Sequence, residues 1–257
     1  MLETATITAV MGESRRPRLA EFCRGSIIRT ELDTPRSCAN FGMSGTKAKR
    51  GATPIVRYTR RGKKSLSAEE VLHDHMAAVT VNIQKTMAVL RTEAFSRALD
   101  LLCDEKRHLY LLGTSLAMHL LGYFSVLTRY MRSNFTLLTG DTANIAHQTA
   151  TISEDAVLFA LSYKRYANVT QTVMQHFHES GHEVIFLTDS YSAPGLQYAS
   201  VPMVVDTGGH NMFNTRCSAI AVLEALINGM SVRYENTVPE RYDAIGTMLR
   251  RLNVYSM

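Results

Sequence analysis

Short apolar runs alternate with helical patterns over the second half of this sequence, and this alternation constrains the fold more than any other feature. The apolar runs cover 108–112, 135–139, 156–161, 183–188 and 202–205. Helical spacing of apolar residues predicts helices over 115–131, 141–151, 169–180, 192–199 and 213–230. Apolar strands separated by helices are typical of a parallel sheet covered on both faces. We therefore predict an α/β domain with three layers, αβα, and a five-stranded parallel sheet.

A long helical pattern precedes this domain. Ser65 or Ser67, followed by Glu69 and Glu70, is typical of a helix N-cap with an acidic first turn. One or two long amphipathic helices are then predicted as far as Cys103, because apolar residues recur at helical spacing: Val71, Met76, Val79, Ile83, Met87, Leu90, Phe95, Ala98, Leu99 and Leu102. A final helix is predicted over 238–252. The interpretation is a helical connector over 66–104 and an α/β domain over 105–257.

The first 65 residues have a different composition. Proline and glycine interrupt every potential helix there, and 14 Lys and Arg against 5 Asp and Glu give a net charge of +9. Residues 66–257 hold 14 Lys and Arg against 18 Asp and Glu, a net charge of −4. A basic segment on a slightly acidic body indicates a polyanionic partner, most often nucleic acid, for one end only. A disordered tail that binds nothing is the other interpretation of this poorly structured 1–65 segment.

Compartment signals favour the cytoplasm. No window approaches the length of apolar sequence that a membrane span needs, and the N-terminus lacks the basic lead of a secretory signal. The four cysteines, Cys23, Cys38, Cys103 and Cys217, show no CxxC spacing and are expected to be reduced thiols. We expect no membrane partner.

Polar residues follow the predicted strands and form the candidate ligand site. Gly113, Thr114 and Ser115 lead directly into a helix, where backbone N–H groups, hydroxyls and the helix dipole can bind an anion. Neither the GxGxxG nor the GK[ST] pattern is present. Similar polar loops follow the third, fourth and fifth strands, and the last of them leads to Phe-Asn-Thr-Arg at 213–216, where a helix opens. These loops favour a phosphorylated, polyhydroxylated small ligand, and Lys164 and Arg165 add positive charge. The predicted ligand-binding residues are Gly113, Thr114, Ser115, Ser162, Lys164, Arg165, Thr188 and Ser192.

Residues for two other chemistries are present in the sequence. An aldose–ketose isomerase needs a base near the strand ends, and His147, His210 and Asp189 are the candidates. No glutamate falls in the ligand loops, so isomerisation is the less favoured alternative. A zinc site at His176, His178 and His182 is disfavoured because Gly181 is predicted to end the helix before His182. We therefore predict no catalytic residue, no metal and no cofactor.

The segment from about 68 to 255 resembles the SIS (sugar isomerase) domain and the helical lead-in of RpiR/MurR-family bacterial transcriptional regulators. The matching pieces are Leu-Tyr-Leu-Leu-Gly-Thr-Ser at 109–115, Val-Leu-Phe-Ala-Leu-Ser-Tyr at 157–163, Ser-Gly-His-Glu-Val-Ile-Phe-Leu-Thr-Asp at 180–189, Ser-Ala-Pro at 192–194, and Phe-Asn-Thr-Arg at 213–216 with Ala-Val-Leu-Glu-Ala-Leu after it. The resemblance implies that Thr114, Ser115 and Ser162 bind the phosphate of a sugar-phosphate effector. It also implies a DNA-binding regulator that forms a homodimer or higher homo-oligomer. The helices over 68–103 and 238–252 are the candidate dimer surfaces.

The chain departs from the family pattern in three places. The usual Ser-x-Ser-Gly-x-Thr loop is replaced by Ser-Tyr-Lys-Arg-Tyr-Ala at 162–167, which predicts a different anion or a partly filled pocket. The first loop is shorter than the family's Gly-x-x-Ser-Ser. The N-terminal helix-turn-helix of such regulators needs three apolar-periodic helices, but the Pro- and Gly-interrupted stretch 34–45 cannot form a recognition helix. We expect this reading domain to be degenerate, truncated or frame-disrupted, so a regulator remnant that does not bind DNA is a further alternative.

Overall fold

The computed structural model describes residues 55–56, 66–209 and 212–255. Its five strands are β1 (His108–Gly113), β2 (Phe135–Leu138), β3 (Ala156–Ser162), β4 (Glu183–Thr188) and β5 (Val201–Val204). They form one parallel sheet in the order β2-β1-β3-β4-β5. The predicted α/β fold with a five-stranded parallel sheet is confirmed, and every strand lies within a residue of its predicted ends.

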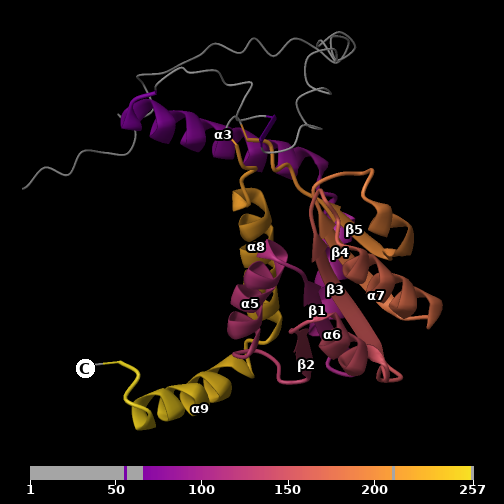
Figure 1. The fold of residues 1–257 in the computed structure, drawn as a ribbon. Helices are drawn as coiled ribbons and strands as arrows, with labels where there is room; N and C mark the ends of the chain where they lie inside the picture. The colour runs from indigo at the N-terminus through magenta and orange to yellow at the C-terminus, as the bar shows by residue number, and fades with distance from the viewer. Residues whose placement is uncertain (1–54, 57–65, 210–211, 256–257) are drawn as a thin grey trace, which may run out of the picture. The chain divides into compact units, whose positions relative to one another are not determined.

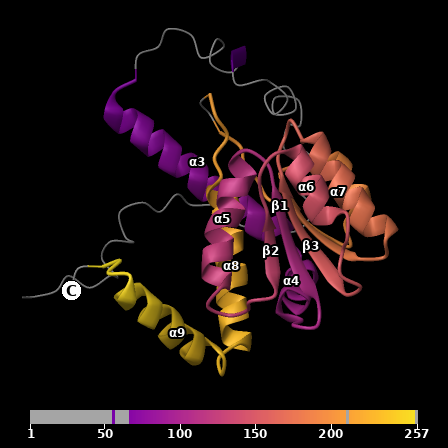
Figure 2. The same ribbon diagram turned by 60° about the horizontal axis from the view of Figure 1, so that its bottom comes forward.

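Helices cover both faces of this sheet, as Figures 1 and 2 show. The helices are α3 (Ala68–Val89), α4 (Thr92–Cys103), α5 (Leu116–Thr128), α6 (Thr142–Thr149), α7 (Asn168–Glu179), α8 (Cys217–Arg233) and α9 (Val238–Arg251). One core lies between the sheet and α4, α5 and α8, and it includes Phe124 and Phe159, whose rings meet edge to face. The second core, on the other face, joins the sheet to α6 and α7 and includes Phe177. These two cores produce the predicted three-layer αβα arrangement.

Two predicted helices begin or form differently from the sequence pattern. The segment predicted as a helix over 192–199 is a short 3₁₀ turn, Pro194–Tyr198, because Pro194 starts the turn and only one turn of chain separates it from β5. The helix predicted from residue 213 begins at Cys217. The long pattern before the domain consists of two helices, since the chain turns at Leu90 and Arg91.

The first long helix packs on the domain through its polar side. A capping box between Ser67 and Glu70 begins α3, as the sequence predicts. Its buried side chains include Asn82 and Thr86, whereas the apolar residues that define the helical pattern are largely exposed, with Met87 74% exposed. The amphipathic pattern therefore locates the helix correctly, but its apolar face is not the face that contacts the domain.

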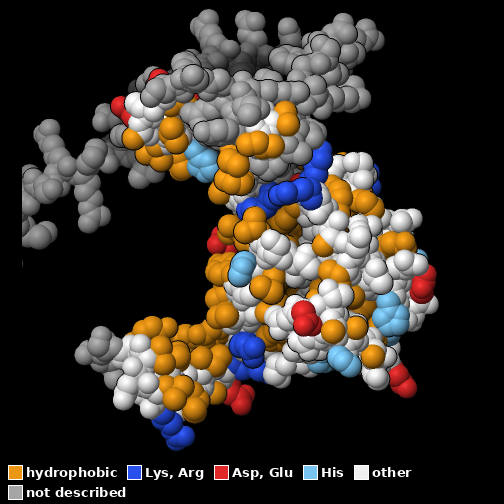
Figure 3. Space-filling view, viewed as in Figure 1, with side chains coloured by type: hydrophobic (Ala, Val, Ile, Leu, Met, Phe, Trp, Pro, Cys, Tyr) orange, Lys and Arg blue, Asp and Glu red, His pale blue; other side chains and the backbone are white. Residues whose placement is uncertain are grey.

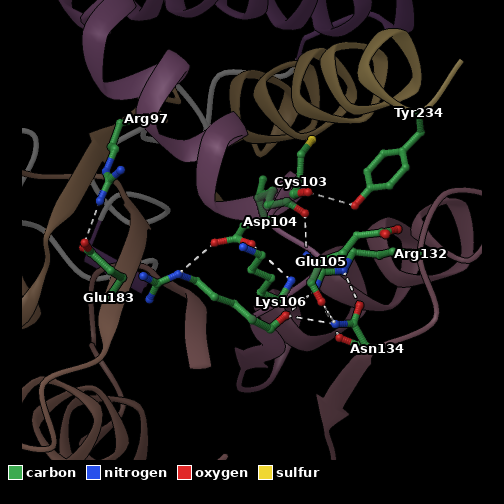
Figure 4. A network of polar contacts seen from close by, with 11 residues as sticks. Arg97, Cys103, Asp104, Glu105, Lys106, Arg132, Asn134, Glu183 and Tyr234 are labelled. Atoms are coloured by element: carbon green, nitrogen blue, oxygen red, sulfur yellow. Dashed lines mark hydrogen bonds and ion pairs between the residues drawn. The ribbon is translucent and has the colours of Figure 1, made fainter. Parts of the chain in front are cut away.

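A buried arginine closes the sheet at the amino-terminal ends of the strands. Arg132 is fully buried between α4 and β2. Its guanidinium donates to the carbonyl of Leu102 at 2.6 Å, to Asn134 Oδ1 at 2.9 Å, and to the carbonyl of Arg107 (Figure 4). Burial is the main cause that lowers the pKa of this guanidinium. The last turn of α4 is thus fastened to the start of the sheet by hydrogen bonds to carbonyl groups, not by an ion pair.

Among the residues that the structure describes, no helix has the length and apolarity that crossing a membrane requires. The predicted 1–65 segment lies outside the described residues except for Ile55 and Val56. The proposed division at residues 65 and 104 therefore stays a prediction.

Candidate functional site

The strand order places the candidate site between β1 and β3. From β1 the chain runs outward to β2 and then returns to β3 on the other side of β1, so the direction of the sheet reverses there. Gly113 at the end of β1 lies opposite Leu161, and Ser162 follows as the last residue of β3. Crevices at such reversal points, outside the carboxyl ends of parallel strands, are where α/β proteins bind ligands.

A cavity of about 440 Å³ opens at this point. Its lining combines hydroxyls, cations and a few apolar side chains from the ends of β1 and β3 and from the start of α8: Thr114, Ser115, Leu116, Ala117, Ser162, Tyr163, Lys164, Arg165, Ala167 and Arg216. Five of the eight predicted ligand residues therefore meet in one cavity. They are Thr114, Ser115, Ser162, Lys164 and Arg165.

Gly113 supports the first loop without lining the cavity. A Cβ at this position would lie 2.7 Å from the carbonyl carbon of Ala117 and 2.9 Å from the nitrogen of Met118. Glycine is therefore required for α5 to start directly against β1. The next turn is constrained as well, because Ser115 has a φ of 53°, which non-glycine residues seldom adopt. Such conformations persist where the surrounding structure imposes them.

The loop after β3 is held by Asp189 from the end of β4. The Asp189 carboxylate accepts hydrogen bonds from the backbone nitrogen of Lys164 at 3.0 Å, the hydroxyl of Tyr166 at 3.1 Å and the hydroxyl of Thr207 at 3.5 Å. Burial and the Asp189 charge raise the pKa of Tyr166 to about 12. Through these contacts Asp189, the candidate base from the sequence, joins three loops. Arg165 lies in this loop with a φ of 72°.

Arg216 is a functional candidate that is absent from the predicted ligand-binding residues. It is the N-cap residue of α8, and its guanidinium stacks on the Tyr163 ring at 4.1 Å from the ring centre. Burial raises the pKa of the Tyr163 hydroxyl, and the charge of Arg216 opposes this rise. The predicted polar turn before α8 gave a signal for this residue, but only the return of the chain to the cavity makes it part of the site.

Three helices begin at this cavity, and the side chains of their N-cap residues do not cap them. Ser115, Ala167 and Arg216 are the N-cap residues of α5, α7 and α8, and none of them makes a side-chain capping hydrogen bond. The first turns of these three helices also contain no acidic residue. By contrast, α3, α4 and α9 have acidic first turns, and Asp141 caps α6. In α8 the Thr215 hydroxyl accepts from the first amide, that of Cys217, at 3.2 Å. The positive ends of α5 and α7 are therefore available to an anion, and that of α8 is available in part.

The other predicted ligand residues lie apart from this cavity. Thr188 is fully buried at the end of β4, opposite Ser162 in the sheet register. Ser192 lines a second hollow, of about 660 Å³, between α3 and the loops that follow β4 and β5. Lys85, Asp189 and Asp206 also line this hollow. Thr188 and Ser192 therefore do not line the cavity between β1 and β3.

The histidines that the sequence offered as a base or as zinc ligands do not line the described part of the cavity. His147 is exposed in the last turn of α6, and it lines neither hollow. His210 lies outside the described residues. The helix α7 ends before His182, and His176 instead contacts the carbonyl of Thr149. Within the described part of the chain, no three His, Cys, Asp or Glu residues are grouped so that they could hold a metal ion.

Residues 101–229, half of the chain, match the SIS domain family. The chain belongs to the SIS domain family. Comparison of the sequence with curated proteins gives no match.

Solved structures with a similar fold include a transcription factor and an enzyme. The sugar isomerase domain of an RpiR transcription factor from Sphaerobacter thermophilus is 23% identical, with a TM-score of 0.59, over 68% of this chain and 96% of that chain. The NanR protein of Vibrio vulnificus, complexed with ManNAc-6P, is 14% identical with a TM-score of 0.58, over 69% of this chain and 70% of that chain. A phosphoheptose isomerase from Francisella tularensis is 13% identical with a TM-score of 0.56, over 65% of this chain and 99% of that chain. These similarities establish the shared fold.

Proposed function

We propose that this SIS domain binds a phosphorylated sugar in the cavity between β1 and β3. The observation that carries the proposal is the convergence on one cavity of three helix N-termini, those of α5, α7 and α8, whose first turns hold no acidic residue. The hydroxyls of Thr114, Ser115 and Ser162 line the same cavity and can donate to phosphate oxygens. Arg165 and Arg216 add positive charge.

Binding without turnover is the form of this proposal that the lining favours. Moving a proton between adjacent sugar carbons needs a base beside the substrate, most often an imidazole or a carboxylate. Among the described residues that line the cavity there is no histidine, aspartate or glutamate. Asp189, the closest candidate by sequence, is engaged by three donors from neighbouring loops. Sugar-phosphate isomerisation is accordingly the alternative function.

In this proposal the sugar phosphate is the effector of an RpiR-type transcriptional regulator. The helix α3, which follows the basic N-terminal segment in sequence, is hydrogen-bonded to the loop after β5. Asn82 donates to the carbonyl of Gly208 at 2.6 Å, and the hydroxyl of Thr86 accepts from the backbone nitrogen of Asp206 at 2.9 Å. The same loop contacts Asp189 through Thr207. A ligand that shifts the position of these loops would therefore shift α3. An effector that contacts two arrangements of α3 differently can in this way change the affinity for DNA.

Exposed apolar side chains on α3 and α9 favour a homodimer. Leu72 and Met76 on α3 are 64% and 57% exposed, and Tyr242 and Met248 on α9 are 63% and 50% exposed. Figure 3 shows hydrophobic side chains gathered along both helices. Contiguous apolar surface of this kind marks protein–protein contacts more often than free surface. We propose that α3 and α9 contribute to the contact between two copies.

A thermal-shift titration tests the binding proposal. Glucose 6-phosphate is expected to raise the unfolding temperature as its concentration increases, whereas glucose at the same concentration is expected to leave it unchanged. The variant Ser162→Ala should weaken the glucose 6-phosphate response, and Ser231→Ala, on the far end of α8, serves as the matched control. No response to any phosphorylated sugar in a panel would contradict the proposal. Conversion of glucose 6-phosphate to the ketose would instead establish the isomerase alternative.

A DNA titration tests the regulatory part separately. Binding of the full chain to DNA from its own locus should respond to the sugar phosphate and should fall steeply with salt. Binding that is insensitive both to DNA sequence and to the sugar phosphate would favour the regulator remnant. Expression of the upstream reading frames would then show whether the helix-turn-helix is encoded elsewhere.

A further inference from the structure

Two residues that line the cavity between β1 and β3 have backbone conformations that glycine adopts more easily. Ser115, after β1, has a φ of 53°, and Arg165, after β3, has a φ of 72°. Among the described residues other than glycine, only Asn253 also has a positive φ. Asn253 follows α9 in the usual closing turn of a helix, in which the Val254 nitrogen donates to the Leu249 carbonyl. The two cases that are not explained in this way therefore lie at one cavity.

These conformations are unfavourable for serine and arginine. A positive φ brings the Cβ of an L-residue too close to the backbone, whereas glycine has no Cβ and adopts a positive φ freely. Glycine at positions 115 and 165 would therefore suit the backbone better. Conformations of this kind persist where the surrounding structure imposes them, and they are concentrated at ligand sites. The Ser115 hydroxyl and the Arg165 guanidinium are the groups that glycine would lack.

Asp189 imposes the conformation of Arg165. Its carboxylate accepts from the backbone nitrogen of Lys164 at 3.0 Å and from the hydroxyl of Tyr166 at 3.1 Å, so one side chain holds the residues on both sides of Arg165. Arg165 itself is exposed, and no hydrogen bond or ion pair joins its guanidinium to the described part of the chain. The backbone of the loop is thus fixed, while the guanidinium donors remain available at the cavity.

We propose that Arg165 selects the phosphate group of the ligand, and that Ser115 donates its hydroxyl to the same group from the loop after β1. This inference rests on the proposed sugar-phosphate function and names the residue that sets its selectivity. A phosphate monoester carries a charge of about −1.5 to −2 at neutral pH. A guanidinium donates two parallel hydrogen bonds to such an oxyanion, and these are strengthened by charge. Arg165 therefore favours a doubly charged ester over a singly charged one.

Calorimetric titration of the full chain with two matched esters tests the proposal. Glucose 6-phosphate and glucose 6-sulfate have the same sugar and a tetrahedral ester group, but the sulfate ester carries a single charge. Glucose 6-phosphate is expected to bind at least about tenfold more tightly. In Arg165→Gly this preference should shrink to about threefold or less.

Thermal unfolding without ligand supplies the second measurement. Arg165→Gly should unfold at the same temperature as the wild type or at a higher one, because glycine relieves the backbone at this position. Asn253→Gly is the matched control, since it also removes a side chain from a residue with a positive φ, but away from the cavity. It should keep the full preference for the phosphate ester. Arg165→Lys, which keeps the charge without the planar fork, should show an intermediate preference.

The outcomes separate this inference from the function on which it rests. A preference that is retained in Arg165→Gly would overturn the assignment of Arg165, whatever the unfolding temperature. A lower unfolding temperature in Arg165→Gly would show that the arginine serves the fold, and would also overturn it. Equal affinity of the wild type for the two esters would overturn the selectivity and leave sugar-phosphate binding in place. Failure of glucose 6-phosphate and of every other phosphorylated sugar in the panel to bind would overturn the proposed function itself.

Discussion

The two ends of the sheet use the same amino acid in opposite ways. At the amino-terminal ends of the strands, Arg132 is fully buried and its donors reach carbonyl groups and the Asn134 amide. At the carboxyl ends, Arg216 is fixed by Tyr163 but keeps donor capacity at a cavity. The helix termini follow the same division, because the carbonyl end of α4 is bonded by a side chain while the N–H ends of α5 and α7 carry no side-chain cap. One end is therefore built for stability, and the other is prepared for an anion.

The largest effect is expected from removing the arginine at the stable end. In Arg132→Met the carbonyls of Leu102 and Arg107 lose a buried donor, so the free energy of unfolding should fall by about 3–5 kcal/mol. Urea unfolding measures this. Arg129→Met, at an exposed arginine on the same turn of chain, should cost less than about 1 kcal/mol. A loss of the same size in both variants would remove the contrast between the two ends.

A smaller loss is expected where the cavity loop meets α5. In Gly113→Ala the new Cβ would press against the backbone of Ala117 and Met118, so about 1–3 kcal/mol of stability should be lost. The affinity for glucose 6-phosphate should fall as well, since α5 must move away from the cavity. Gly122→Ala, within the same helix but with open space around its Cβ, should be neutral or slightly stabilising. Unchanged ligand affinity in Gly113→Ala would show that the start of α5 is not part of the site.

Asp189→Asn tests whether the Asp189 carboxylate positions the loop after β3 at the cavity. The asparagine keeps the shape but loses the charged acceptor for the Lys164 nitrogen and the Tyr166 hydroxyl, so stability should fall by about 1 kcal/mol. The affinity for glucose 6-phosphate should fall several-fold, because the loop that holds Ser162 and Arg165 loosens. A change in affinity with the pH profile of binding unaltered identifies positioning. A loss of turnover on a sugar phosphate would identify Asp189 as a base instead.

The smallest effect concerns the ion pair between Arg97 and Glu183, 2.6 Å apart at the start of β4 (Figure 4). Burial opposes ionisation of Glu183, but hydrogen bonds from Ser200 and Arg97 together with the Arg97 charge hold the pKa of its carboxyl below the ordinary value. A carboxyl with a lowered pKa stabilises the folded state above its unfolded pKa, and this contribution disappears as the pH falls through the folded value. Glu183→Gln should therefore cost about 1 kcal/mol or less at neutral pH and nothing in acid. A loss of stability in Glu183→Gln that persists in acid would show that packing, and not the ion pair, causes the loss.

The sheet could be predicted from the sequence because the strands are short, apolar and separated by clear helical patterns. The run 183–188 predicts β4 with both of its ends. Features that depend on tertiary packing could not be predicted from the sequence. Nothing in the spacing of Met76 and Met87 indicates that α3 packs through Asn82 and Thr86 instead. The turn at Pro194 resembles a helix in its apolar spacing, but it has room for only one 3₁₀ turn before β5.

Those residues of the candidate site that lie at the ends of strands could be predicted from the sequence. Thr114, Ser115 and Ser162 stand directly at strand ends, so their meeting follows from a parallel sheet. Arg216 is more than 50 residues further along the chain, and its place depends on how α8 packs against α5. Ser192 lies in the loop after β4, but β4 lies outside the reversal between β1 and β3, and its loop faces a different hollow.

A crystal structure of the protein grown with glucose 6-phosphate tests the central claim most directly. We expect the phosphorus atom beside the start of α5, with its oxygens within hydrogen-bond distance of Thr114, Ser115 or Ser162. Phosphate density in the hollow beside α3, or on the surface away from both hollows, would contradict the assignment of the carboxyl end of β1 and β3 as the anion site.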